Sequence, residues 1–141
     1  MQKIIIDGKL PGANDYIKAN RANAKYGAWY KRNVEEVIMW QMGRLRRIRT
    51  PCFISFEWHE KTKRRDKDNV VFAKKFVFDA MQKSEKLMND NNECVIGFTD
   101  TFVYDKRYGV TLTIWEYGDG TKALLQMVMQ VIKNTLTMFL C

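Results

Sequence analysis

A chain of 141 residues, 46% hydrophobic and 13% aromatic with only 2 prolines and 8 glycines, has the length of one domain and the composition of a folded globular protein. These values exclude a multi-domain, disordered or fibrous protein. The formal charge of +8 is uneven, because residues 1–75 carry 18 Lys and Arg against 8 Asp and Glu, whereas residues 76–141 carry 6 against 8. The first half therefore predicts a basic surface for a polyanion, most simply nucleic acid, although a solvated basic face fits the charge equally well.

Three elements are predicted in the first half of the chain. Residues 2–7 indicate a short buried strand, and residues 8–12 a turn. An amphipathic helix is predicted over about 23–44 from apolar residues at helical spacing, namely Tyr26, Tyr30, Val34, Val37 and Ile38. Its end carries four arginines that suit the helix dipole as well as a phosphate: Arg44, Arg46, Arg47 and Arg49. After Pro51, the alternation over residues 52–58 predicts a strand with one face in the core.

The second half continues with a polar loop at 61–68 and a helix from about 68 to 86, whose expected buried stripe is Val70, Ala73, Val77, Ala80 and Met81. A turn at 89–92 precedes a predicted hairpin of residues 94–104 and 108–117. Residues 119–141 predict a third helix with an apolar face of Leu125, Val128, Met129, Ile132, Leu136 and Phe139. This helix is too polar to span a bilayer, so we expect it to be covered by the domain or a second subunit, with membrane-surface binding as the alternative. The expected fold is α+β, a small mixed β-sheet with two to three packed helices in a single domain.

Several kinds of chemistry are disfavoured by the residues present. A single histidine, His59, and three scattered cysteines (Cys52, Cys94 and Cys141) make a zinc site improbable. Ser55 shares a strand with His59 but lacks the strand-to-turn context of a nucleophilic serine. The glycines at 118–120 indicate a turn and not a phosphate-binding loop. The unpaired cysteines and the absence of a signal-peptide pattern lead us to expect a reducing cytoplasm.

Two aspartates one residue apart, Asp66 and Asp68, can point to the same cation. They lie in the most basic stretch of the chain, with Lys61, Lys63, Arg64, Arg65 and Lys67. Carboxylates repel the phosphates that such a surface attracts, and a divalent cation between them removes the conflict, which is typical of a metal-dependent nuclease. The alternative is that these aspartates cap the following helix.

Asp90, in the turn after the second predicted helix, is a third candidate carboxylate. That helix of about 17 residues would separate its two ends by ~25 Å. Asp90 therefore joins the other two only if the chain folds back, and otherwise it is a residue favoured in turns.

Several blocks of this sequence together resemble the RusA family of phage-derived Holliday junction resolvases. They are Arg64-Arg65-Asp66-Lys67-Asp68-Asn69, Phe78-Asp79-Ala80, Asn89-Asp90 and Leu112-Thr113-Ile114-Trp115-Glu116, with weaker likeness at 10–14 and 30–34. The resemblance covers about residues 3–117, and the Arg-Asp-x-Asp-Asn block is its most specific part. Residues 1–117 would then form a RusA-like nuclease domain, and residues 118–141 an amphipathic helix outside the family pattern.

The resemblance implies an endonuclease, dependent on Mg²⁺ or Mn²⁺, that resolves four-way DNA junctions by paired phosphodiester hydrolysis. It implies a homodimer that does not associate with a membrane and that acts in the cytoplasm of a bacterial host, encoded by a phage or prophage. Asp66, Asp68 and Asp90 would be the catalytic metal ligands, and Lys75 the catalytic lysine. The interval between Asp68 and Asp79 is three residues longer than in the family's best-known member, which leaves Lys74 as a substitute. The DNA-binding residues expected beside this site are Lys61, Lys63, Arg64, Arg65, Lys67, Lys74, Arg46 and Arg47.

Three other functions fit parts of the sequence. A non-catalytic DNA-binding protein of phage origin explains the charge but not the acidic trio. An RNA-binding protein could stack bases on Trp29, Tyr30, Trp58 and Trp115, although their spacing assigns most of these residues to the core. A structural virion or interaction protein would show no metal-dependent activity. Cleavage of a labelled junction in Mg²⁺ separates the enzyme from all three.

Overall fold

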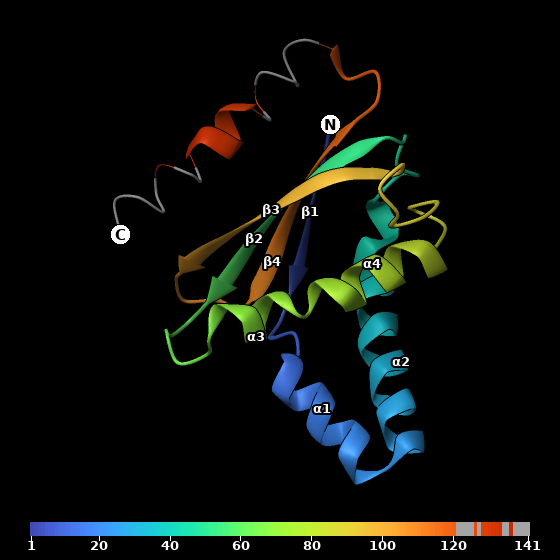
Figure 1. The fold of residues 1–141 in the computed structure, drawn as a ribbon, viewed down its shortest axis with the longest axis vertical. Helices are drawn as coiled ribbons and strands as arrows, with labels where there is room; N and C mark the ends of the chain where they lie inside the picture. The colour runs from blue at the N-terminus through green and yellow to red at the C-terminus, as the bar shows by residue number, and fades with distance from the viewer. Residues whose placement is uncertain (121–125, 127, 134–135, 137–141) are drawn as a thin grey trace.

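The computed structural model describes residues 1–120, 126, 128–133 and 136, and Figure 1 shows its fold. The elements in chain order are β1 (Gln2–Asp7), α1 (Ala13–Ala22), α2 (Ala24–Gln41), a 3-10 turn η1 (Met42–Arg44), β2 (Cys52–Glu60), α3 (Lys67–Val71), α4 (Lys74–Lys83), β3 (Val95–Tyr104) and β4 (Gly109–Glu116). This arrangement confirms the expected α+β class, with one mixed sheet and packed helices in a single domain.

The four strands form one sheet in the order β1-β4-β2-β3. β4 pairs antiparallel with both β1 and β2, whereas β3 pairs with β2 in parallel. α3 and α4 form the crossover between the two parallel strands. β3 is thus an edge strand, reached directly from these helices.

The predicted hairpin of the last two strands is wrong. Both strands exist, but β2 lies between them and pairs with each. β2 is buried at seven of its nine positions, whereas β3 is largely half-buried or exposed. The difference in burial follows from the order, because β2 has a neighbouring strand on each side, whereas β3 at the edge has one.

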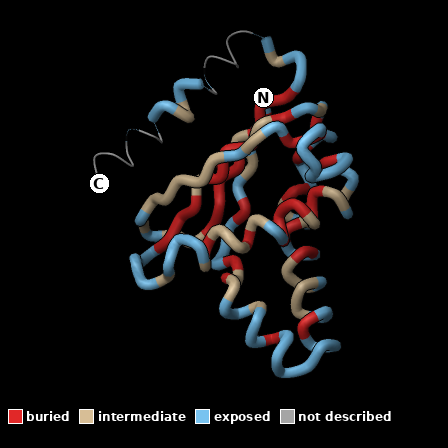
Figure 2. Tube along the Cα trace, viewed as in Figure 1, coloured by how far each residue is buried: buried red, intermediate tan, exposed pale blue. Residues whose placement is uncertain are grey.

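The core lies between one face of the sheet and the helices. From the sheet it takes Ile54, Phe56 and Trp58 of β2 and alternate residues of β4, and from α4 it takes the predicted apolar stripe. In Figure 2 these buried positions cluster where α4 and the second half of α2 meet the sheet, while α1 and the start of α2 extend away as a hairpin that is mostly exposed. Tyr26 and Val37, which were predicted for the buried stripe of α2, are 47% and 55% exposed. Tyr26 lies in the hairpin that leaves the sheet, whereas Val37 lies on the solvent side of α2, because Glu35 and Ile38 take the buried side.

The predicted helix over 68–86 is two helices. α3 ends at Val71, and Phe72 and Ala73 form a turn in which the Ala73 amide donates to the Val70 carbonyl at 3.1 Å. The predicted buried residues, Val70, Ala73, Val77, Ala80 and Met81, are all buried, because the apolar stripe continues from α3 into α4. Phe72 and Ala73 keep helical backbone angles, so α4 continues the course of α3.

A buried ion cluster joins α2 to α4. Glu35, 1% exposed, pairs with Lys31 and Lys83. Lys31 also contacts Asp79, with Nζ 2.7 Å from Oδ2. Burial opposes ionisation of Asp79, but Lys31 outweighs it and, with Lys75 and Lys83, holds the pKa of Asp79 below its usual range. Helix packing here rests on charges as well as apolar contacts.

The C-terminal tail is described in part. Residues 126, 128–133 and 136 are helical, and Leu125 and Phe139 of the predicted apolar face lie outside the described residues. Val128, Met129, Ile132 and Leu136 are 42–58% exposed in this single chain. Within the described part, no helix has the length and apolar character needed to cross a bilayer.

Candidate active site

A hollow of about 400 Å³ lies where α4 meets the start of β3. It brings together Lys74 and Lys75 of α4, Asp90 of the following loop, and Phe98 of β3. The chain therefore folds back after α4 far enough to place Asp90 beside the start of that helix, but Asp66 and Asp68, which a common site also requires, do not line the hollow. One predicted carboxylate and both candidate lysines share this hollow.

Lys74 is held in place by the sheet. Its ammonium group pairs with the carboxylate of Asp100 on β3 and lies 4.0 Å from the centre of the Phe98 ring. The other Asp100 oxygen accepts a hydrogen bond of 2.8 Å from the indole nitrogen of Trp58. With its side chain 13% exposed, Lys74 is the more constrained of the two lysines.

Lys75 is far less constrained. Its side chain is 53% exposed, and its Nζ lies 3.8 Å from Oδ2 of Asp79, the i,i+4 pair that helical spacing permits. Asp79 has a closer partner in Lys31 at 2.7 Å. The ammonium group of Lys75 can therefore leave this pair for a phosphate at little cost.

Asp66 and Asp68 lie at the start of α3. Asp66 is the N-cap residue and its carbonyl accepts from the Val70 amide, yet its carboxylate makes no capping hydrogen bond. Within the described residues, the carboxylates of Asp66, Asp68 and Asp90 form no hydrogen bond or ion pair, although lysines and arginines surround the first two. Side-chain capping therefore does not explain Asp66.

The three carboxylates are hard oxygen donors, which suit Mg²⁺ or Mn²⁺. Their arrangement does not fit one ion, because the described part of the chain contains no group of three or more His, Cys, Asp or Glu side chains that could hold a metal. Lys67 of α3 lies over Phe102 of β3, whereas Asp90 borders the hollow beside Phe98. Four residues of strand separate these two ring positions by ~13 Å. Chemistry favours a cation here, but this single chain does not assemble its ligands.

The predicted DNA-binding residues fall into two groups at opposite ends of β2. Lys61, Lys63, Arg64 and Lys67 are exposed beyond its C-terminal end. Arg46 and Arg47 are exposed before its N-terminal end, and Arg47 adjoins Met88 in the loop after α4. A nine-residue strand of ~30 Å separates the two groups.

Arg65 differs from its neighbours. Its guanidinium group forms a fork with the buried carboxylate of Glu60 and donates to the carbonyl of Leu10 at 2.9 Å. Its side chain is 15% exposed. Arg65 therefore anchors the loop before α3 and is poorly placed to contact a phosphate.

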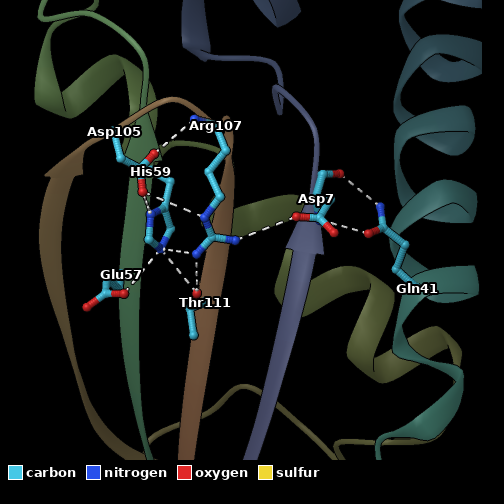
Figure 3. Close-up of polar contacts among 7 residues, drawn as sticks. All are labelled: Asp7, Gln41, Glu57, His59, Asp105, Arg107 and Thr111. Carbon is cyan, nitrogen blue, oxygen red and sulfur yellow. Dashed lines mark hydrogen bonds and ion pairs between the residues drawn. The ribbon is translucent and has the colours of Figure 1, made fainter.

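A second polar cluster occupies the other face of the sheet (Figure 3). Nδ1 of His59 lies 2.8 Å from Asp105, and Nε2 lies 2.6 Å from Arg107 and 3.1 Å from the hydroxyl of Thr111. A guanidinium can only donate, so in these contacts Nε2 accepts and Nδ1 carries the proton. Nε2 also lies 3.1 Å from Oε1 of Glu57.

This second cluster stabilises the turn between β3 and β4. Thr111 is 4% exposed, so its hydroxyl is not available as a nucleophile. The backbone amide of Arg107 and the ring of His59 hold the pKa of Asp105 below its usual range. The guanidinium group of Arg107 also lies 3.6 Å from the carboxylate of Asp7. The backbone amide and carbonyl of Asp7 are both hydrogen-bonded to the side-chain amide of Gln41. The cluster therefore joins the turn to β1 and α2.

Sequence reasoning missed Asp100. The sequence pattern that could have revealed it is the alternation Phe98, Asp100, Phe102, which places a carboxylate among aromatic residues on the strand face that meets the helices. A charge on that face requires a partner, and Lys74 supplies it.

A comparison of this chain with protein-family models and with curated proteins found no match.

Proposed function

We propose that this protein is a metal-dependent endonuclease of branched DNA that resolves Holliday junctions. The observation that carries the proposal is the set of unpaired carboxylates: Asp66 and Asp68 among the exposed lysines and arginines at the start of α3, and Asp90 beside Lys74 and Lys75 in the hollow. Unpaired carboxylates weaken DNA binding unless they serve another purpose. The resemblance of residues 64–69 to the RusA family supports this assignment.

The roles proposed for individual residues follow from their surroundings. The proposal keeps the three carboxylates as ligands of Mg²⁺ or Mn²⁺, and it therefore requires Asp90 to come to Asp66 and Asp68, because the described part of this chain does not bring the three together. When bound, such an ion would polarise a phosphate and lower the pKa of a water. Lys75, exposed and weakly paired, would contact the negative charge that develops on the phosphate. Lys74, fixed by Asp100, would keep the hollow electropositive.

The proposal includes a twofold homodimer. Resolving a four-way junction requires two nicks on opposed strands, and a dimer with one site in each subunit supplies both. The bacterial cytoplasm, with a phage or prophage as the origin, is part of the same proposal.

Cleavage of a labelled four-way junction, compared with a linear duplex in Mg²⁺, tests the proposal. Asp66→Asn, Asp68→Asn and Asp90→Asn keep the side-chain size but remove the charge a hard cation requires, so each should lose nearly all cleavage. Each should still bind the junction without metal at least as well as the parent. Glu36→Gln removes an exposed, unpaired carboxylate of α2 and is the matched control. Near-normal cleavage by two of the three Asp→Asn proteins would exclude this site.

A non-catalytic DNA-binding protein is the second candidate. The observation that favours it is the lack of an assembled ligand cluster among the described residues. It predicts tight junction binding and no Mg²⁺-dependent product from any variant, including the parent.

A further inference from the structure

The exposed edge of the sheet carries a row of aromatic side chains. Phe98, Phe102 and Tyr104 occupy alternating positions of β3 and share one strand face with Asp100. Phe98 is 50% exposed and Tyr104 is 40% exposed, because the edge strand has a neighbour on one side. In Figure 2 β3 is mostly half-buried or exposed along its length, unlike β2 and β4.

Each ring of this row has a lysine above it. The ammonium groups lie 4.0 Å from the ring centre of Phe98 for Lys74, 5.4 Å from Phe102 for Lys67, and 5.3 Å from Tyr104 for Lys63. The pattern continues into the next turn, where Lys61 and Lys9 lie 5.3 and 5.4 Å from Tyr108. From Phe98 to Tyr104 the row extends ~20 Å, the length of about six nucleotides of one strand.

Lysines alone would suit any form of DNA, but exposed rings distinguish between forms. A duplex hides the faces of its bases, and an unpaired strand presents them. Stacking of a base on an aromatic ring is worth more than an exposed contact between an ammonium group and a ring. A base can therefore replace the ammonium groups of the exposed Lys63 and Lys67, whose flexible stems can carry the charge to the adjacent phosphate. Lys74 stays paired with Asp100 at the end of the row.

We propose that the β3 edge binds an unpaired DNA strand, with its bases on Phe102 and Tyr104 and its phosphates on the lysines above these two rings. This inference deepens the proposed function and rests on it for the choice of DNA. One end of the row is the hollow that contains Lys75 and Asp90. A strand bound along the row leads into the candidate active site, which makes a locally opened branch point the substrate.

The test uses fluorescence anisotropy with labelled dT12 and a labelled 12-base-pair duplex, without Mg²⁺. Tyr104→Leu removes the ring at an exposed position, and Tyr104→Phe restores it. Phe98 is unsuitable, because it packs against Phe56 and Phe78 in the core. Trp40→Leu is the matched control, since it removes an aromatic side chain that is 84% exposed on α2, away from the row.

Tyr104→Leu should weaken dT12 binding about five- to a hundredfold and leave duplex binding within about twofold, whereas Tyr104→Phe and Trp40→Leu should bind dT12 like the parent. Equal losses for dT12 and duplex, no loss for either, or the same loss in Trp40→Leu would overturn the inference. Tighter binding of rU12 than of dT12 would overturn the assignment to DNA. The outcome is independent of cleavage, so a protein that binds dT12 through Tyr104 but never cuts a junction would refute the nuclease and keep the binding edge.

Discussion

The exposed lysines beside the β3 edge, Lys61, Lys63 and Lys67, give a measurable electrostatic prediction. Replacing all three with Met removes three charges and keeps the apolar stems that cover the rings. Each lost phosphate contact lowers the slope of log affinity against log salt by about 0.9, so the triple variant should have a slope smaller by about 2.7. Between about 50 and 200 mM salt, the parent should therefore lose about 40-fold more affinity than the variant.

Fluorescence anisotropy of a labelled four-way junction, titrated at several salt concentrations without Mg²⁺, measures both slopes. The control variant replaces Lys3, Lys18 and Lys86 with Met, because these lysines contact no aromatic ring in the described part of the chain. Both variants have the same net charge, so an effect of overall charge would appear equally in the two. An equal change of slope in both, or an unchanged slope in the first, refutes the assignment of the edge lysines to phosphates.

The remaining predictions concern α4. Lys75→Met should lower junction cleavage at least tenfold. It should change the free energy of unfolding by less than about 0.5 kcal/mol, because the pair of Lys75 with Asp79 is exposed and weak. Cleavage and urea unfolding, measured in parallel, check this prediction, and a large loss of stability would contradict it. Lys74→Met should cost about 1–3 kcal/mol in the same unfolding assay, since Asp100 would lose its cation in a partly buried place; an unchanged stability would mean that the pair does not constrain the helix. The pKa of Asp79 is lowered in the fold, so its stabilising effect is present above the ordinary Asp pKa and is lost as pH falls through the lowered value. Asp79→Asn should therefore flatten the decline of stability between about pH 6 and about pH 2, and an identical decline in parent and variant would show that the contact with Lys31 contributes nothing.

Much of the local structure could be predicted from sequence. All four strands were predicted near their observed bounds, β1 from its run of isoleucines and β2 and β4 from alternating apolar residues, and the apolar stripe of 70–81 identified the buried face of α3 and α4. β1 was expected to be buried, but as an edge strand it leaves Ile5 46% exposed. These patterns are local, because a residue's spacing along a strand or helix determines which side it faces. The Asp66 and Asp68 block was likewise predicted near a helix start, and it is found there.

Strand order, the helix break and the partners of charged residues could not be predicted this way. Placing β2 between β3 and β4 depends on pairing between residues far apart in sequence, which a local turn signal does not encode. Helix α1 was also missed, because among its ten residues only Tyr16 and Ile17 are large and apolar, and its one buried residue is the small Ala19. Asp100 was missed since its meaning depends on Lys74, which reaches it from another element.

The place of β4 between β1 and β2 affects how the protein folds during synthesis. β1 is synthesised about 110 residues before its partner β4, with Gln2 opposite Ile114. Until residue 116 has been made, neither β1 nor the long apolar β2 has its β4 neighbour, and both present unpaired backbone. Such distant pairing slows folding, because the intervening chain loses conformational entropy when its two ends meet, before any strand contact offsets that loss. The nascent chain must therefore keep two strand edges from aggregating until the strand that joins them is translated.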